Sequence, residues 1–506
     1  MLITSLANCA DQSVLEFDVC VVGAGAAGIY SAVRLANLGL NVGVVDAGPT
    51  ETVAPDAVGY IAEFGDQFYN GAVDGRAFGF GGTTSRWGGV LIPHSNHDVR
   101  GNDEPCWKHI SETVAREKRA VLVGLGAKNH DDFDRYPARL LPDVTGELSE
   151  VGIDMMASLF LPFRTKNLST LARKCKANLS VYTDATASDW KIVDENVTSL
   201  RLRTLTRLEH EVRARWFILA AGTLESARSL LEIQAKYPGL LQSEILGRGL
   251  GDHLSTAVAS VDVSDGKRCL DLFAPRFERG WMRSFRFLDR NQNHQTRAFA
   301  HFVFDNRNAG FALAKKVLTS LQARRVPKLR IAEIVTGLAG VSGLAYSRYV
   351  RNRLHIPQST DMKLQLDVEQ PFDPSNRIVL SNATDGYGRR RLIINWKIGD
   401  HAATQIDRIA DEFVRRWNRS KLPKLTRASV SLSGQKPHDA FHPVGACRLG
   451  PSEEYPVGFD LSVNTVRNLS VLCTGVLPTA GSANPTFSML CLGEVLCRRI
   501  GTLIGN

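Results

Sequence analysis

Residues 17–38, which read FDVCVVGAGAAGIYSAVRLANL, decide the fold. The apolar run 17–22 predicts a strand buried on both faces, and the apolar spacing of 29–38 predicts a helix that ends at Gly39. The glycines between them follow the G-x-G-x-x-G spacing, and a second apolar run, 40–45, ends in an acidic residue. This order of strand, glycine turn, helix, strand and acid predicts a dinucleotide-binding unit.

Each residue type in this unit has its own physical task. Gly23 allows the tight turn, Gly25 lets the backbone approach a pyrophosphate, and Gly28 lets the helix lie close to the strand, while the helix N-terminus offers free N–H groups to phosphates. Asp46, 18 residues beyond Gly28, can accept hydrogen bonds from both ribose hydroxyls, which indicates FAD or NAD rather than NADP. The predicted cofactor residues of this unit are Gly23, Gly25, Ala26, Ala27, Gly28, Asp46 and Ala47.

The composition of the chain is that of a globular protein. Its 506 residues are 44% hydrophobic and 22% charged, which excludes disorder, collagen-like repeats and a coiled coil. A chain of this length exceeds one ordinary core, so we expect two closely packed domains.

The net charge of +9 is concentrated in one segment. Residues 315–353 hold nine basic side chains and one acid, Glu333, and no nucleic-acid-binding motif is present, so we expect no nucleic-acid partner. We favour solvated helix faces for this segment, which flanks the apolar stretch 331–346. The alternative is a surface that attracts a phosphorylated or lipid-linked substrate, or the head groups of a membrane.

Cysteine usage and the N-terminus point to a reducing compartment. The nine cysteines are scattered without a C-x-x-C pair, so neither a disulfide framework nor a metal site is predicted. The first ten residues contain no basic residue and no apolar run typical of a signal peptide, and no apolar run reaches the roughly 18 residues of a membrane span. We expect a cytoplasmic protein.

Four later segments decide which dinucleotide the unit binds. The loop 81–89, GGTTSRWGG, combines bare backbone with a tryptophan that a flexible linker does not need. Residues 212–231 predict a second strand, small turn and helix. The segment 441–450, FHPVGACRLG, and the segment 472–499, with Asn-Pro at a helix start, place a histidine and an amide on loops that can face one another.

In this order, the segments resemble the glucose-methanol-choline (GMC) flavoprotein oxidoreductases. The resemblance also covers GRGLGDH at 247–253 and the stretch 369–381. Within that family, the chain resembles the compact bacterial branch that is associated with oxidising sugar, aminoglycoside or glycoside hydroxyls. It departs from the family pattern at four positions that carry no catalytic side chain: Ala446, Leu449, Gly475 and Leu477.

The resemblance implies an FAD-dependent oxidation of a small-molecule alcohol, with O2 or another carrier as electron acceptor. His442 is then the base that takes the hydroxyl proton, and Asn484 holds the substrate oxygen, while Asp252 and His253 are structural members of a turn. Because 81–89 contains no histidine, we expect FAD to be noncovalent. The further cofactor residues implied are Gly82, Thr83, Arg86, Trp87, Gly88, Gly89, Ala187, Ala221, Gly222, Gly475, Asn484, Pro485 and Thr486.

The predicted fold class is α/β with an α+β substrate domain: a Rossmann-like FAD-binding domain beside an antiparallel-sheet substrate-binding domain, as in the GMC fold. We place the discontinuous FAD-binding domain at 1–265 and 432–506, and the substrate-binding domain at 266–431. Alternating or apolar runs at 362–368, 377–380 and 392–396 predict strands that form one antiparallel sheet over the flavin.

Three functions remain open from the sequence. The leading one is oxidation of a carbohydrate, glycoside or related polyhydroxylated metabolite. The same chemistry on a hydrophobic natural-product alcohol is the nearest alternative, and a flavin-containing lyase without redox turnover is the third. Oxidase and dehydrogenase are both compatible with these motifs.

Overall fold

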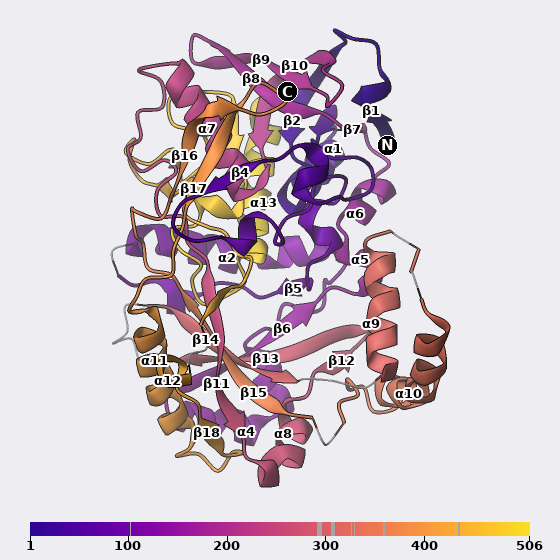
Figure 1. The fold of residues 1–506 in the computed structure, drawn as a ribbon, viewed down its shortest axis with the longest axis vertical. Coiled ribbons are helices and arrows are strands. Elements are labelled where there is room, and N and C mark those ends of the chain that lie inside the picture. Colours follow the sequence, from indigo (N-terminus) through magenta and orange to yellow (C-terminus); the bar gives the residue numbers. More distant parts are fainter. Residues whose placement is uncertain are drawn as a thin grey trace.

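The protein consists of two sheet-based halves that lie one above the other in Figure 1. The computed structural model describes residues 1–101, 103–290, 296–304, 309–324, 326–327, 329–357, 360–433 and 436–505. The predicted fold class, mixed α/β with a parallel and an antiparallel sheet, is confirmed.

The first half is built on an eight-stranded sheet in the order β1-β7-β3-β2-β10-β9-β8, with β22 beside β10. Its centre is parallel: residues 19–22 pair with 42–45 on one side and with 216–219 on the other. These central strands read as continuous apolar runs because they are buried on both faces. The strands are β1 (Leu2–Ser5), β2 (Val14–Val22), β3 (Val42–Val45), β7 (Leu179–Thr183), β8 (Thr186–Val193), β9 (Asn196–Arg203), β10 (Glu209–Leu219) and β22 (Leu469–Val471).

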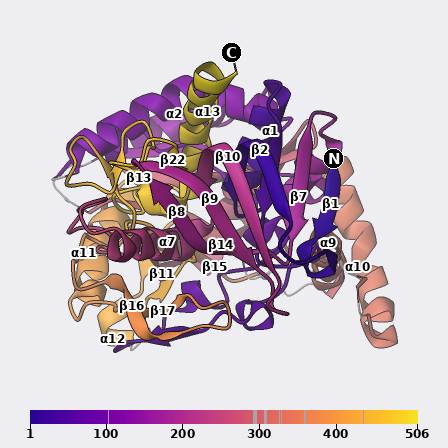
Figure 2. The ribbon, with the colours of Figure 1, turned by 90° about the horizontal axis from the view of Figure 1, so that it is seen from above.

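Four helices surround this sheet. Figure 2 shows α1 (Ala26–Asn37), α13 (Pro485–Ile504) and α2 (Glu104–Gly124) together on one side, and α7 (Gly222–Lys236) follows β10.

The two ends of the described chain are joined by a buried carboxylate. Glu494 of α13 is almost fully buried and accepts hydrogen bonds from Tyr30 Oη at 2.8 Å and from Arg34 Nη2 at 2.6 Å, both of α1. The carboxylate needs these partners because a buried charge without them is unfavourable. Helices α1 and α13 are thereby fixed side by side.

The second half is a nine-stranded antiparallel sheet in the order β18-β11-β15-β14-β13-β6-β5, with β12 beside β13 and β19 beside β11. One face of it packs on an aromatic cluster of Phe273, Phe287, Phe302 and Trp417, the last from α11 (Ala402–Trp417). The strands are β5 (Val90–Leu91), β6 (Ile153–Phe160), β11 (His253–Val261), β12 (Arg276–Glu278), β13 (Trp281–Asp289), β14 (Ala298–Phe304), β15 (Met362–Glu369), β18 (Leu425–Arg427) and β19 (His438–Asp439).

The strand pairing differs from the sequence prediction in two respects. The three strands predicted around 362–396 all form, but only β15 joins the large sheet. β16 (Arg377–Thr384) pairs with β17 (Arg390–Asn395), and β17 pairs on its other side with β4 (Ala62–Phe64). The expectation of one sheet was therefore wrong. In addition, β5, β6 and β11 come from residues assigned to the first domain, although they pair in the second sheet.

The remaining helices are peripheral. The predicted apolar stretch near 331–346 forms α10 (Ile331–Tyr349), which packs against α9 (Ala309–Gln322) at the edge of the molecule. In the part of the chain that the structure describes, every helix is too short or too polar to cross a bilayer. The others are α3 (Arg135–Leu140), α4 (Pro142–Glu150), α5 (Phe163–Lys166), α6 (Ser169–Lys174), α8 (Gly266–Phe273) and α12 (Val430–Ser433).

Candidate active site

A cavity of about 500 Å³ brings the predicted site residues together. Its lining comes from the glycine turn after β2, the loop 74–90, the turn between β10 and α7, and the C-terminal loops that carry His442 and Asn484. A cavity of this size lies within the usual range for a cofactor site, roughly 300 to 1,000 Å³. The predicted residues that line it are Gly23, Gly25, Ala26, Ala27, Asp46, Ala47, Gly82, Thr83, Arg86, Trp87, Gly88, Gly89, Ala187, Ala221, Gly222, His442, Asn484, Pro485 and Thr486.

Two predicted residues, Gly28 and Gly475, lie behind the cavity wall rather than on it. A Cβ on Gly28 would sit 1.8 Å from the carbonyl oxygen of Gly23, so only glycine allows the helix to start so close to the turn. Gly475 is similarly confined, because a Cβ on it would lie 3.0 Å from the methyl group of Thr223. Both positions shape the wall by packing.

The turn leaves room where a cofactor phosphate is expected. No atom lies within 4 Å of the place where a Cβ of Gly25 would be, and this glycine precedes the N-terminus of α1. Free N–H groups at a helix start attract an anion. The residues present at this turn therefore fit the pyrophosphate of FAD.

Asp46 has a structural task in addition to the predicted one. It accepts backbone N–H groups of Ala24 at 2.7 Å, Gly48 at 2.9 Å and Gly79 at 2.8 Å. Burial raises its pKa to about 6, against the effect of these three hydrogen bonds. The carboxylate thus joins the glycine turn to the loop before residue 81 while it lines the cavity.

The loop 82–89 is held in place from behind. The Trp87 indole donates to the carbonyl of Lys166 at 2.7 Å, and the Gln322 side-chain amide donates to the carbonyls of Thr84 at 3.1 Å and Trp87 at 3.0 Å. Because Gln322 is the last residue of α9, the peripheral hairpin supports this wall of the cavity directly.

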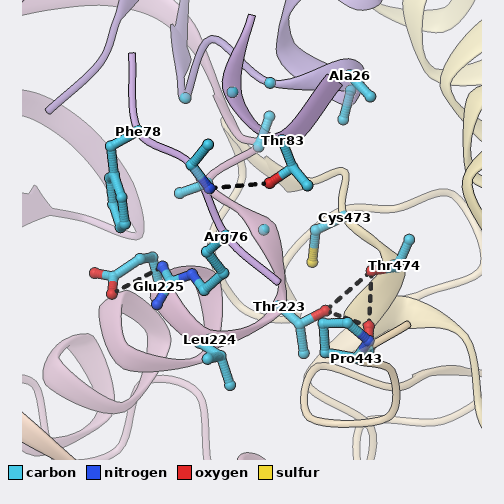
Figure 3. Close-up of a pocket in the computed structure, with 18 of the residues that line it drawn as sticks. Ala26, Arg76, Phe78, Thr83, Thr223, Leu224, Glu225, Pro443, Cys473 and Thr474 are labelled. Atoms are coloured by element: carbon cyan, nitrogen blue, oxygen red, sulfur yellow. Dashed lines mark hydrogen bonds and ion pairs between the residues drawn. The ribbon is translucent and has the colours of Figure 1, made fainter. Parts of the chain in front are cut away.

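Arg76 and Glu225 are cavity residues that sequence reasoning missed. Figure 3 shows them extended toward each other, and the Arg76 Nη2 atom lies 3.2 Å from Glu225 Oε1. The guanidinium also covers the ring of Tyr60 at 4.3 Å, and its buried Nη1 has no hydrogen-bond partner among the residues that the structure describes. Such an atom is suited to an acceptor on a ligand. Arg76 stands in a loop without a motif, so no sequence signal pointed to it.

The loop that carries His442 is anchored on both sides. The backbone N–H of His442 donates to both carboxylate oxygens of Asp252, at 2.9 and 3.0 Å. The carbonyl of Pro443 accepts from the hydroxyls of Thr223 at 2.7 Å and Thr474 at 2.8 Å, as Figure 3 shows. Phe441 has a φ of 62°, a left-handed conformation that is unfavourable for a bulky residue and that these anchors maintain.

A chain of hydrogen bonds fixes the proton positions on the two neighbouring imidazoles. His253 Nε2 lies 2.9 Å from the carbonyl oxygen of Gly481, which can only accept, so this nitrogen carries the hydrogen. In a neutral ring, His253 Nδ1 is then an acceptor for His442 Nδ1, 3.0 Å away. His442 Nε2 is left with a lone pair, and Asn484 Nδ2 donates to it at 3.0 Å.

The amide orientation of Asn484 is fixed by an arginine. Arg286 Nη2 lies 3.0 Å from Asn484 Oδ1, and an arginine has only donors, so the atom facing it is the amide oxygen. The guanidinium covers the Phe299 ring at 4.2 Å and lies 3.7 Å from Asp367 Oδ2. The amide N–H₂ is consequently directed to His442.

The pKa values of this group follow from its burial. Burial, and then the charge of His253, lowers the pKa of His442 to about 3, and burial lowers the pKa of His253 to about 4. Burial also lowers the pKa of Arg286 to about 10, although Asp367 opposes this, so the guanidinium stays charged. Both imidazoles are therefore neutral near pH 7, and His442 Nε2 is available as a base.

The structure thus brings His442 and Asn484 together, as expected, and adds His253, Arg286 and Asp367 behind them. His253 was expected to be only a structural member of a turn, yet its ring contacts the ring of His442. The sequence GDH at 251–253 was the one signal that could have identified it. Arg286 and Asp367 lie in strands without a motif.

Comparisons with known proteins agree with this picture. Residues 372–493 match the family model described as GMC oxidoreductase. The pyridoxine 4-oxidase from Mesorbium loti has a similar structure, with 16% identity, a TM-score of 0.55, and coverage of 95% of this chain and 98% of that one. A formate oxidase variant from Aspergillus oryzae has 15% identity and a TM-score of 0.56 over 98% and 99% of the two chains. No curated protein sequence matches significantly. At these identities, the two structural likenesses show the shared fold.

Proposed function

We propose that this chain, which belongs to the GMC oxidoreductase family and is an FAD-dependent oxidoreductase, oxidises a hydroxyl group of a small-molecule alcohol with His442 as the base. The observation that carries the proposal is the chain of hydrogen bonds that leaves the lone pair of His442 Nε2 facing Asn484 Nδ2.

A substrate hydroxyl fits between these two atoms chemically. It donates its hydrogen to His442 Nε2 and accepts one from Asn484 Nδ2, so it replaces the direct bond between the two side chains. Arg286 keeps the amide oxygen of Asn484 occupied, which prevents the amide from turning its acceptor to the substrate. When bound, FAD supplies the hydride acceptor. The glycine turn, Arg76 and the N-terminus of α13 are positioned to bind it noncovalently, the turn through Gly23, Gly25, Ala26 and Ala27.

Two substrate classes are consistent with this chemistry. The resemblance to the compact bacterial branch supports a carbohydrate, glycoside or related polyhydroxylated metabolite. The residues beside His442 in the lining favour a second candidate, an alcohol with a hydrophobic body, because Ala440, Phe441 and Pro443 offer no carboxylate or amide for sugar hydroxyls. Dioxygen is the acceptor we favour, because both similar structures are named as oxidases.

An anaerobic absorbance titration of the purified flavoprotein tests the proposal. Sugars, glycosides and aminoglycosides form one panel, and aliphatic, aromatic and terpenoid alcohols form the other. We expect one panel to bleach the flavin band and to produce hydrogen peroxide on re-aeration. Product formation without bleaching would instead establish a lyase, and bleaching that persists in His442→Ala would remove His442 as the base.

A further inference from the structure

The α9–α10 hairpin is an appendage that the catalytic proposal leaves unexplained. Figures 1 and 2 both place α10 at the edge of the molecule, with α9 between it and the rest of the protein. The two helices touch closely where Gly337 meets Leu313: a Cβ on that glycine would lie 2.4 Å from the leucine side chain. One side of α10 thus packs against the rest of the protein.

The charged side chains of α10 lie on that packed side. The sequence of the helix contains only two, Glu333 and Arg348. Glu333 forms an ion pair with Lys316 of α9 at 2.8 Å, and Arg348 covers the ring of Phe277 at 3.6 Å and donates to the carbonyl of Gly280. Both residues therefore face other parts of the protein.

Near both ends of α10, the described side chains on the opposite side are apolar and exposed. Ile331, Ile334, Ala345 and Tyr349 recur at helical spacing on one face, with Tyr346 beside them. Ile331 is 81% exposed, Tyr349 79% and Tyr346 52%. Large apolar side chains at this exposure along one helix face indicate a contact with something outside the chain. We call this set the α10 face.

Basic residues flank the α10 face at both ends of the helix. Arg330 precedes the helix and is exposed, and Arg351 follows it with its guanidinium 5.3 Å from the ring of Tyr346, while Lys315 is exposed on the neighbouring α9. Residues 315–353 contain nine basic residues and one acid, so this segment alone has a net charge of +8, against +9 for the whole chain. Among the described residues of this segment, Lys315, Arg330 and Arg351 make this edge of the molecule positive.

We propose that the α10 face docks on the surface of an anionic phospholipid bilayer. Apolar and tyrosine side chains with a basic surround are the combination that places a helix in the interface plane, with its apolar side among the acyl chains and its cations at the head groups. A second copy of this chain is the less favourable occupant, because it would bring another charge of +8 against the first. The basic sequence of this segment alone favours solvated helix faces, and the exposed apolar side chains of α10 reverse that preference.

Vesicle co-sedimentation of the full-length FAD-loaded protein tests the proposal. We expect binding to vesicles of phosphatidylcholine with phosphatidylglycerol, little binding to phosphatidylcholine alone, and weakening by high salt, which screens the head groups. Ile331→Ser/Tyr349→Ser should weaken binding by at least about tenfold, because two large apolar side chains no longer enter the bilayer. Lys315→Glu/Arg351→Glu, which leaves the apolar side chains in place, should abolish the preference for phosphatidylglycerol.

The matched control is Leu205→Ser/Val263→Ser, which removes two exposed apolar side chains elsewhere and should leave binding unchanged. Absence of binding to phosphatidylglycerol vesicles at low salt overturns the proposal, as does wild-type binding by Ile331→Ser/Tyr349→Ser. Binding to polyglutamate but to no vesicle would assign the surface to an acidic protein instead. A doubled mass in light scattering that the same variant abolishes would assign it to a second copy.

Discussion

The Nδ1 atoms of His442 and His253 lie 3.0 Å apart, and only one of them carries the hydrogen that joins the two rings. The carbonyl of Gly481 determines that this hydrogen is on His442, because it accepts a hydrogen bond from His253 Nε2 and so leaves His253 Nδ1 unprotonated in the neutral ring. A backbone oxygen thus determines that the second ring nitrogen of His442 carries no hydrogen. The function of the site depends on this arrangement.

Replacement of His442 by alanine should lower the anaerobic rate of flavin reduction by about 10²- to 10⁴-fold, the usual contribution of a general base. FAD should remain bound, because His442 is one of many lining residues. Stopped-flow reduction and the flavin-to-protein absorbance ratio measure the two effects. Loss of FAD in the variant would mean that His442 holds the cofactor.

The pH dependence of flavin reduction should lack an inflection near the ordinary histidine pKa of 6.5, since burial and His253 lower the pKa of His442 to about 3. In His253→Ala, water enters the cavity beside the His442 ring, and the neighbouring imidazole that becomes charged in acid is absent, so the inflection should move upward toward 6.5. The maximal rate should also fall about ten- to a hundredfold, because a buried hydrogen bond that orients the base is lost. A wild-type inflection near 6.5 would show that His442 is protonated more easily than its burial implies.

The same two histidines should make the protein less stable in acid. Their folded pKa values of about 3 and 4 lie below the unfolded value of 6.5, so the unfolded chain binds more protons and stability is lost as the pH falls below about 6.5. Each ring should lower the free energy of unfolding by on the order of 2 kcal/mol as the pH falls from 6.5 to 5. Urea denaturation at these two pH values measures the loss, and His253→Gln should reduce it.

Arg286 should affect the rate through Asn484. Arg286→Gln alone removes the cation 3.7 Å from buried Asp367, which keeps its contact with His301 Nδ1 at 3.1 Å, and should lower the free energy of unfolding by about 3 kcal/mol. The double variant Arg286→Gln/Asp367→Asn removes both charges and should recover much of that stability. Its flavin reduction should still be about tenfold slower, because the amide of Asn484 can rotate. Wild-type kcat in a stable double variant would contradict the positioning role.

Two glycines of the N-terminal turn offer a matched test of the cofactor site that needs no substrate. Gly28→Ala places a methyl group 1.8 Å from the Gly23 carbonyl and should prevent stable folding. Gly25→Ala meets no protein atom within 4 Å, so the apoprotein should melt as the wild type does while its affinity for FAD falls. Fluorescence titration with FAD and calorimetry separate the two outcomes. Equal FAD affinity in wild type and Gly25→Ala would show that the pyrophosphate does not bind at this turn.

The parts of the site that could be predicted from the sequence are those that lie in local sequence motifs. Gly23, Gly25 and Asp46 lie within one local unit, where each residue type has a direct structural reason. Arg286 reaches Asn484, and Asp367 reaches Arg286, only because β13, β14 and β15 pair in a register that no local pattern specifies. The small sheet in which β17 lies between β16 and β4 was missed for the same reason. Long-range register depends on competition between strands of similar pattern.

The ion pair between Arg34 and Glu494 has a consequence for biosynthesis. The first helix of the cofactor site is complete at residue 37, but its buried partner stands 460 positions later. At a synthesis rate of roughly 5 to 20 residues per second, the early segment waits tens of seconds before the last helix emerges from the ribosome. During that interval, α1 exposes the surface that α13 will cover, and the nascent chain cannot hold FAD at its C-terminal contacts. The protein should depend on chaperones during translation, and loss of α13 should leave a chain that no excess of flavin rescues.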